Sequence, residues 1–269
     1  MAAAHSALVD QVVEVDEKLM ELYLEQGDSI TPEQLHAPFE QALRDGHLIP
    51  VCFVSARTGA GVNELLDIFA KLAPNPAEGN PPMFVKGEGK DAEEFRSEPD
   101  PKKHVIAHVF KVVMDPFVGK VGVFRVHQGT ISVGTNLYVG QINKPFRVGH
   151  LYKLQGKEYQ EVKTLVPGDI GAVAKVDEIV FDAVLHDSHD EDRIHMLPLD
   201  FPQPMYGLAV EPKRRGDEQR IFEVLHKLEM EDPCFVMERH PTTHETVING
   251  LGDLHMRAVL EKMQKQYNL

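Results

Sequence analysis

Residues Ala107 to Val139 read AHVFKVVMDPFVGKVGVFRVHQGTISVGTNLYV, and they set the architecture of the middle of this chain. Two apolar runs rich in β-branched residues, Val105–Met114 and Val118–Val126, flank an Asp-Pro turn, and a third run, Gly129–Val139, contains glycines at turn positions. Short β-branched runs punctuated by glycine and proline are typical of strands rather than helices. We therefore predict a meander or barrel of strands.

The apolar alternation slips by one residue inside the second run. Val121 and Val123 follow a period of two, and Phe124 and Val126 then continue it out of step. A β-bulge, or a strand buried on both faces, explains such a slip.

Composition indicates a folded chain with more than one domain. The 269 residues suffice for two or three ordinary domains, and 42% hydrophobic with 26% charged residues is typical of a soluble globular protein. No apolar run approaches the length of a membrane span, and no secretory signal opens the sequence, so we expect no membrane contact and a cytoplasmic location. Cys52 and Cys234 lie in apolar, strand-like runs and are expected to be buried free thiols in a reducing compartment.

The formal net charge of −14 argues against a nucleic-acid partner, because phosphate binding needs clustered lysine and arginine. A local basic patch on an acidic body is still compatible with this charge.

Periodicity predicts helices at the start of the chain. Apolar spacings of four, three, four and three residues predict one amphipathic helix over residues 7–26. Thr31-Pro32-Glu33-Gln34 is a capping box with proline at the first helical position, so a second helix is expected to begin there and reach Asp45. Pro38 inside this helix is expected to kink or shorten it.

A strand, a loop and a third helix are expected next. Leu48–Val54 is a continuous apolar run of the kind found in buried parallel strands. The loop Ser55–Gly61 follows, and then a helix whose apolar face runs from Val62 to Leu72. From Pro74 to Lys103 proline, glycine and charge dominate, which predicts a linker, and Gly87–Lys103 is expected to be disordered.

Further strands and a second α/β arrangement follow the central stretch. Barrel strands are predicted at Phe146–Leu154, Tyr159–Leu165 and Ile170–Val176. The end of the chain alternates as strand, helix, strand, strand, helix, which is a ferredoxin-like split unit without its last strand. The predicted elements are Met205–Val210, Glu218–Glu229, Phe235–Arg239, Thr246–Ile248 and Asp253–Tyr267.

Two short motifs could in principle bind a ligand, but we interpret both as structural. HDSHDEDRIH places His186, His189 and His195 among four acidic residues, but the spacing matches no standard metal motif, so a solvated loop is preferred. Gly250–His255 (GLGDLH) lacks the third glycine and the βαβ setting of a dinucleotide fingerprint, so we interpret it as a turn into a helix.

Taken in order, these motifs resemble the translational GTPases, and elongation factor G most closely. Residues 107–139 resemble its second domain, VSARTGAGV at 54–62 resembles the last guanine-nucleotide motif of the GTPase fold, and residues 209–263, with EPK, EDP and GLGDLH, resemble its third domain. The resemblance implies a multidomain chain with α/β, all-β and α+β parts. They are the C-terminal part of a P-loop GTPase domain (1–73), a linker (74–103), a translation-factor β-barrel (104–200) and a ferredoxin-like third domain lacking its last strand (201–269).

The resemblance also implies a nucleotide site. In that family the backbone at Ser55 and Ala56 lies against the guanine base, with Arg57 beside it. The sequence contains no GxxxxGK[ST] P-loop, no Asn-Lys-x-Asp motif and no Asp-x-Pro-Gly-His segment. We therefore expect no catalytic or metal-binding residue here and no GTP hydrolysis by this chain alone, with GTP and Mg²⁺ bound in a full-length parent.

The implied partners are the ribosome, including small-subunit rRNA, and the tRNA–mRNA complex that such a factor translocates, for a monomeric protein. Candidate RNA contacts are cations in a turn and on the barrel: Lys213, Arg214, Arg215, Lys120 and Arg125. Two other interpretations stay open: a sister GTPase with a ribosome-protection, recycling or release task, and a non-enzymatic ribosome- or RNA-binding module.

Overall fold

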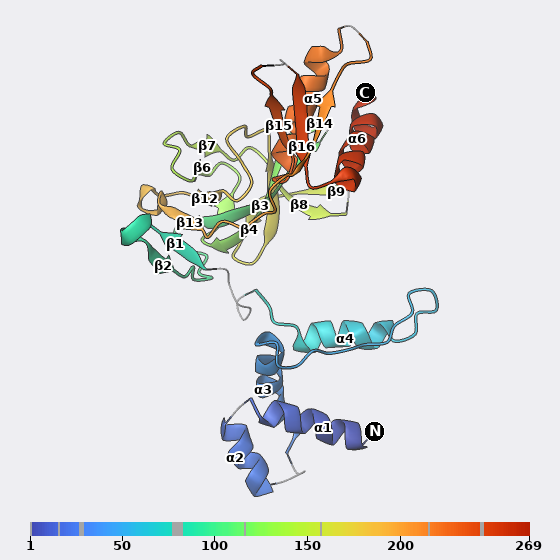
Figure 1. Cartoon of the computed structure of the whole chain (residues 1–269). Coiled ribbons are helices and arrows are strands. Elements are labelled where there is room, and N and C mark those ends of the chain that lie inside the picture. The colour runs from blue at the N-terminus through green and yellow to red at the C-terminus, as the bar shows by residue number, and fades with distance from the viewer. Residues whose placement is uncertain are drawn as a thin grey trace. The chain divides into compact units, whose positions relative to one another are not determined.

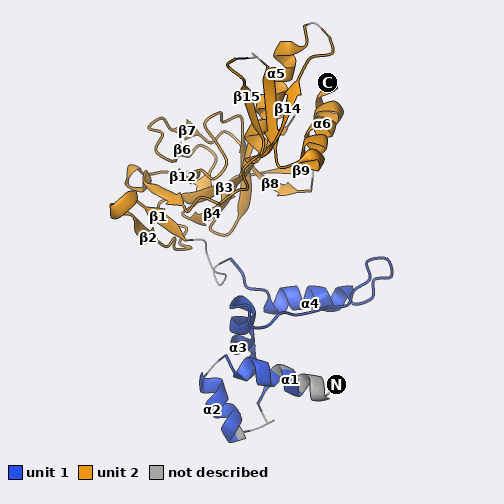
Figure 2. Ribbon diagram, viewed as in Figure 1, with its two compact units in different colours: residues 1–81 blue, residues 82–269 orange. Residues whose placement is uncertain are grey.

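The computed structural model describes residues 2–15, 17–26, 30–76, 83–115, 117–156, 158–214, 216–242 and 245–269. Figure 1 shows its helices and strands, and Figure 2 its division into two compact units, residues 1–81 and 82–269. No helix within the described ranges is long and apolar enough to cross a membrane.

Unit 1 is helical where it is regular. Its helices are α1 (Ala2–Val13), α2 (Glu17–Gln26), α3 (Pro32–Arg44) and α4 (Val62–Leu72). The prediction of a single helix over residues 7–26 is wrong, because α1 ends in a tighter turn in which the Val15 N–H donates to the Val12 carbonyl. The break lets both helices pack their apolar faces into one core with α3, through Val12, Leu19 and Ala42 among others.

The predicted start of α3 is confirmed. The Gln34 N–H donates to the Thr31 hydroxyl, and the Thr31 N–H donates to Gln34 Oε1 at 2.9 Å, which is a capping box. Pro38 lies inside the helix without ending it, and Gly46, with φ of 74°, follows the C-cap Asp45.

The predicted buried strand at Leu48–Val54 is wrong. Leu48 is buried against the helices, but Ile49, Val51 and Phe53 are 79%, 75% and 92% exposed and the segment is irregular. A strand needs hydrogen-bonded neighbours, and the described residues of unit 1 include no other strand to provide them.

Unit 2 is built on an antiparallel eight-stranded sheet with the order β7-β6-β12-β3-β4-β11-β8-β9. A two-stranded pair of β5 and β10 accompanies it. Its core contains Phe124, Leu137, Leu151 and Leu185, all without exposed surface. The strands predicted from Val105 to Val176 are present, but three of them, Gly129–Val139, Phe146–Leu154 and Tyr159–Leu165, are each divided into two shorter strands. The strands are β3 (Ile106–Asp115), β4 (Gly119–Gln128), β5 (Ile131–Ser132), β6 (Asn136–Val139), β7 (Phe146–Arg147), β8 (Leu151–Gln155), β9 (Glu158–Val162), β10 (Thr164–Leu165), β11 (Ile170–Ala174) and β12 (Val184–His186).

Of the two explanations of the slipped alternation, burial of β4 on both faces holds, whereas the bulge at this point belongs to the partner strand β3 and does not shift the side chains of β4. Val109 pairs with Phe124 and Lys111 pairs with Val123, which leaves Phe110 as an extra residue in a bulge of β3. β4 is also buried on both faces, because Phe124 lies in the barrel core and Val123 in a separate apolar cluster.

The expectation of disorder over Gly87–Lys103 is wrong. β2 (Glu93–Phe95) pairs with β1 (Phe84–Lys86), which pairs with β13 (Ile194–Met196) in a small antiparallel sheet. The composition is polar, but Phe84 and Phe95 are placed so that they pack with Ile194, and this apolar contact orders the segment.

The end of unit 2 has the predicted strand, helix, strand, strand, helix order. The sheet β14-β16-β15 is antiparallel throughout, and α5 and α6 pack on it (Figure 1). The central contacts are made by Leu225, Phe235, Ile248 and Met256. The elements are β14 (Tyr206–Val210), α5 (Glu218–Glu231), β15 (Val236–Arg239), β16 (Thr246–Gly250) and α6 (Asp253–Tyr267).

Candidate functional site

The Ser55–Gly61 loop is a closed turn held by its own backbone. The Ser55 N–H donates to the Ala60 carbonyl at 2.9 Å, and the Gly59 N–H donates to the Ser55 carbonyl at 2.8 Å. Gly61 has φ of 74°, and a Cβ there would lie 2.3 Å from the Phe53 carbonyl oxygen, so glycine is required before α4 begins.

The three residues predicted to contact a guanine base lie together at the start of this turn. Ser55 is half-buried and its hydroxyl accepts from the Thr58 N–H at 3.3 Å, whereas Ala56 and Arg57 are exposed. Among the described residues, no acceptor takes the Ala56 amide. This amide is therefore open to water or to a ligand.

The candidate cations are not equivalent. Lys213 and Arg214 are exposed in the turn between β14 and α5, whereas Arg215 lies outside the described residues. Lys120 is only 9% exposed, its Nζ donates to the Asp177 carbonyl at 2.7 Å, and burial lowers its pKa. Arg125 is half-buried in β4. The geometry therefore favours the turn over the barrel as a place for phosphate contact.

The histidine-rich segment is a solvated loop only in its middle, where His189 is exposed, because His186 belongs to β12 and His195, half-buried, to β13. His186 has no exposed surface, and its two ring nitrogens face the carbonyl oxygens of Ser188 and Gly140 at 2.8 and 2.7 Å. Its ring stacks on Tyr138. These contacts of His186 join β12 to neighbouring segments. No group of three or more potential metal ligands occurs among the described residues.

The GLGDLH motif is a turn into α6, as predicted. His255 Nε2 lies 2.9 Å from Asp232 Oδ2, and the Leu251 N–H donates to His255 Nδ1 at 3.1 Å. Both ring nitrogens are therefore used inside the domain, with the proton on Nε2.

Cys234 lies near this histidine in the chain's third domain. It is a buried free thiol, and burial together with Asp232 raises its pKa. Cys52 is also free, and half-buried. Cys234 therefore agrees with the prediction of a buried free thiol, whereas Cys52 is free but less buried than predicted.

A carboxylate that the sequence analysis did not single out joins the barrel to the following domain. Glu231, at the end of α5, has a 7% exposed side chain, accepts from the Met114 N–H of β3 at 2.5 Å and forms a short ion pair with Lys262 of α6. Burial and this carboxylate raise the pKa of Tyr267. The EDP triplet contains Glu231, but nothing in its spacing indicates a partner 117 positions away.

An antiparallel barrel followed by a split strand-helix-strand-strand-helix domain defines a translation-factor-like protein. Family models identify residues 104–182 as elongation factor G domain 2 and residues 201–269 as elongation factor G domain III, together more than half of the chain. The chain therefore belongs to the elongation factor G-like family.

A solved structure supports this assignment. A crystal structure of a protein from Thermus thermophilus matches 95% of this chain with a TM-score of 0.74 and 32% sequence identity. The present chain spans 35% of the length of that protein.

Proposed function

We propose that this chain acts within a ribosome-binding translational GTPase of the elongation factor G type, which uses GTP to move the tRNA–mRNA complex. The observation that carries the proposal is the succession of two domains, residues 104–182 and 201–269, that both match that family. Glu231 supports it, because a buried contact between the two domains provides a route by which one can influence the other. A cytoplasmic location and a monomeric state remain predictions.

Nucleotide binding is part of the proposal. The exposed amide of Ala56, flanked by Ser55 and Arg57, would contact the guanine base, while the phosphates and Mg²⁺ would depend on residues that this sequence does not contain. In a full-length factor, Ala56→Pro removes the amide and should lower the preference for GDP over ADP several-fold. An unchanged preference would exclude Ala56 as the base-reading donor.

Ribosome binding is tested by co-sedimentation of the chain with purified ribosomes over a range of salt concentrations. Lys213→Glu together with Arg214→Glu should weaken binding several-fold at low salt and flatten its salt dependence, because two phosphate contacts are lost. The matched control reverses Arg257 and Lys265, two cations that are also exposed but lie on α6.

Three outcomes separate the parts of the proposal. Loss in the first variant alone supports an RNA contact at the turn. Equal binding of all variants at low salt would remove Lys213 and Arg214 from the interface, and failure of the unmodified chain to co-sediment would contradict ribosome binding itself. Assays of translocation, recycling and release with the full-length factor then distinguish the translocase from its sister factors.

A further inference from the structure

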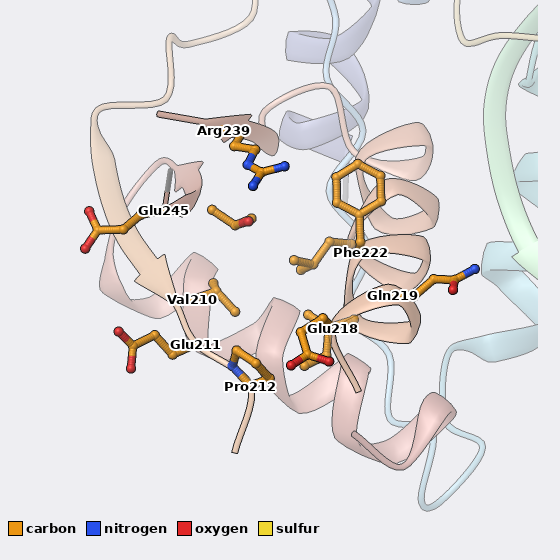
Figure 3. A pocket seen from close by; sticks show the side chains of 11 residues that line it. Val210, Glu211, Pro212, Glu218, Gln219, Phe222, Arg239 and Glu245 are labelled. Carbon is orange, nitrogen blue, oxygen red and sulfur yellow. The ribbon is translucent and has the colours of Figure 1, made fainter. Parts of the chain in front are cut away.

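A cavity of about 510 Å³ lies in the last domain, between the first two turns of α5 and one row of the sheet (Figure 3). Val210, Thr246 and Arg239 form that row, since Val210 and Arg239 both pair with Thr246. Ile221 and Phe222 line the helix side. Phe222 is 52% exposed, so the cavity presents apolar surface to solvent.

The charged groups around this apolar surface are mostly acidic. Glu211, Glu218 and Glu245 line the cavity together with one cation, Arg239. Glu218 accepts from the Gly216 N–H at 2.7 Å, and none of the four forms an ion pair with another described residue. In Figure 3, Arg239 and Glu218 lie on opposite sides of the cavity.

We propose that the cavity receives a lysine or arginine side chain from an extended segment of a partner protein. Such a side chain combines an alkyl stem, which matches Val210, Ile221 and Phe222, with a cationic head that the glutamates attract. Arg239 repels the head toward Glu218 and can donate to a backbone carbonyl of the same segment. Glu211 and Glu245 lie at the rim with their carboxylates directed outward (Figure 3), and three glutamates against one arginine make the surroundings of the cavity unfavourable for a nucleic-acid phosphate.

This inference does not depend on ribosome binding. Pro212 lines the cavity and the exposed Lys213 and Arg214 follow it in sequence, but neither of these two cations lines the cavity itself.

Methyl resonances of Val210, Ile221 and Leu225 in the full chain provide the readout. The first probe, n-butylammonium, is the lysine side chain without its backbone, and we expect saturable shifts with a dissociation constant of about millimolar. Pentanoate has the same stem with the opposite charge and should shift these signals less, as should inorganic phosphate. The peptide Ac-Leu-Lys-Leu-NH₂ should bind more tightly than Ac-Leu-Glu-Leu-NH₂.

Variants that change the charge around the cavity should raise or lower the affinity for n-butylammonium in a predictable sense. Glu218→Gln with Glu245→Gln should weaken n-butylammonium binding about five-fold or more, because two of the attracting charges are removed. Arg239→Gln should strengthen it, and Glu223→Gln, exposed on α5 outside the cavity, should leave it unchanged. Stronger binding of pentanoate or phosphate, or the absence of saturable shifts with n-butylammonium, would overturn the proposal.

Discussion

Leu48–Val54 of unit 1 and Val121–Val126 of unit 2 are both short apolar segments, but only the second forms a buried strand. Each is a short, mostly apolar run with three β-branched residues, although only the first contains a proline, Pro50, yet Phe53 is 92% exposed and Phe124 has no exposed surface. β4, which contains Phe124, is hydrogen-bonded to β3 on one side and to β11 on the other. The difference shows that an apolar run has strand potential, whereas the strand itself requires partners on its edges.

A matched pair of truncations gives the strongest test of this contrast. Phe124→Ala should lower the free energy of unfolding of unit 2 by about 3–5 kcal/mol, because it opens a cavity in the barrel core. Hydrogen exchange measured by mass spectrometry under increasing denaturant follows peptides of each unit separately. The contrast fails if Phe53→Ala destabilises unit 1 to a similar extent.

Acid should affect the barrel through His127. Burial, with Arg125 and His108 nearby, lowers the pKa of His127 from 6.5 to about 4. Below pH 6.5 the unfolded chain binds a proton that the folded chain does not, so stability is complete above that pH and declines as pH falls toward 4. Between pH 7 and pH 5 this histidine should cost unit 2 about 2 kcal/mol, which His127→Gln should remove.

The same exchange experiment at the two pH values measures this difference. A drop in the stability of unit 2 that is unchanged in His127→Gln would assign the acid sensitivity to other groups.

Glu231 tests whether the barrel and the following domain stabilise each other within unit 2. Glu231→Gln keeps an acceptor for the Met114 N–H but loses the charge that Lys262 faces, so we expect a loss of about 1–2 kcal/mol in residues 218–269. Lys265→Gln breaks an exposed pair with Glu261 and should change stability by less than about 0.5 kcal/mol. Equal effects of the two variants would mean that the buried contact adds nothing to an ordinary surface pair.

The smallest effect is expected where the apolar run is exposed. Val51→Ser and Phe53→Ser should each change the stability of unit 1 by less than about 0.5 kcal/mol, since neither side chain leaves a packed environment. Light scattering should show less self-association, because an exposed apolar patch is removed. A clear loss of stability would instead show that these side chains are covered in solution.

Local signals in the sequence were sufficient for much of the fold. The capping box at Thr31–Gln34, the strand runs of residues 105–176 and the two helical faces near the end of the chain depend on interactions within a few residues. Family resemblance added the identity of the two matched domains. The loop at Ser55–Gly61 was also found in this way, and its part in nucleotide binding stays a prediction.

Other features depended on contacts between residues far apart in the chain. Phe84 orders a polar segment by packing near Ile194, His186 is buried because Gly140 and Ser188 supply acceptors, and Glu231 meets Met114. The spacing of residues along the chain does not indicate which distant residues come into contact. The sequence therefore determined the family and most elements of residues 105–269, because these arise from local periodicity and ordered motifs, but not the helix break near Val15 or the irregular Leu48–Val54 segment. Burial, partners and the cavity beside α5 depend on which surfaces meet, and they became visible only with the assembled structure.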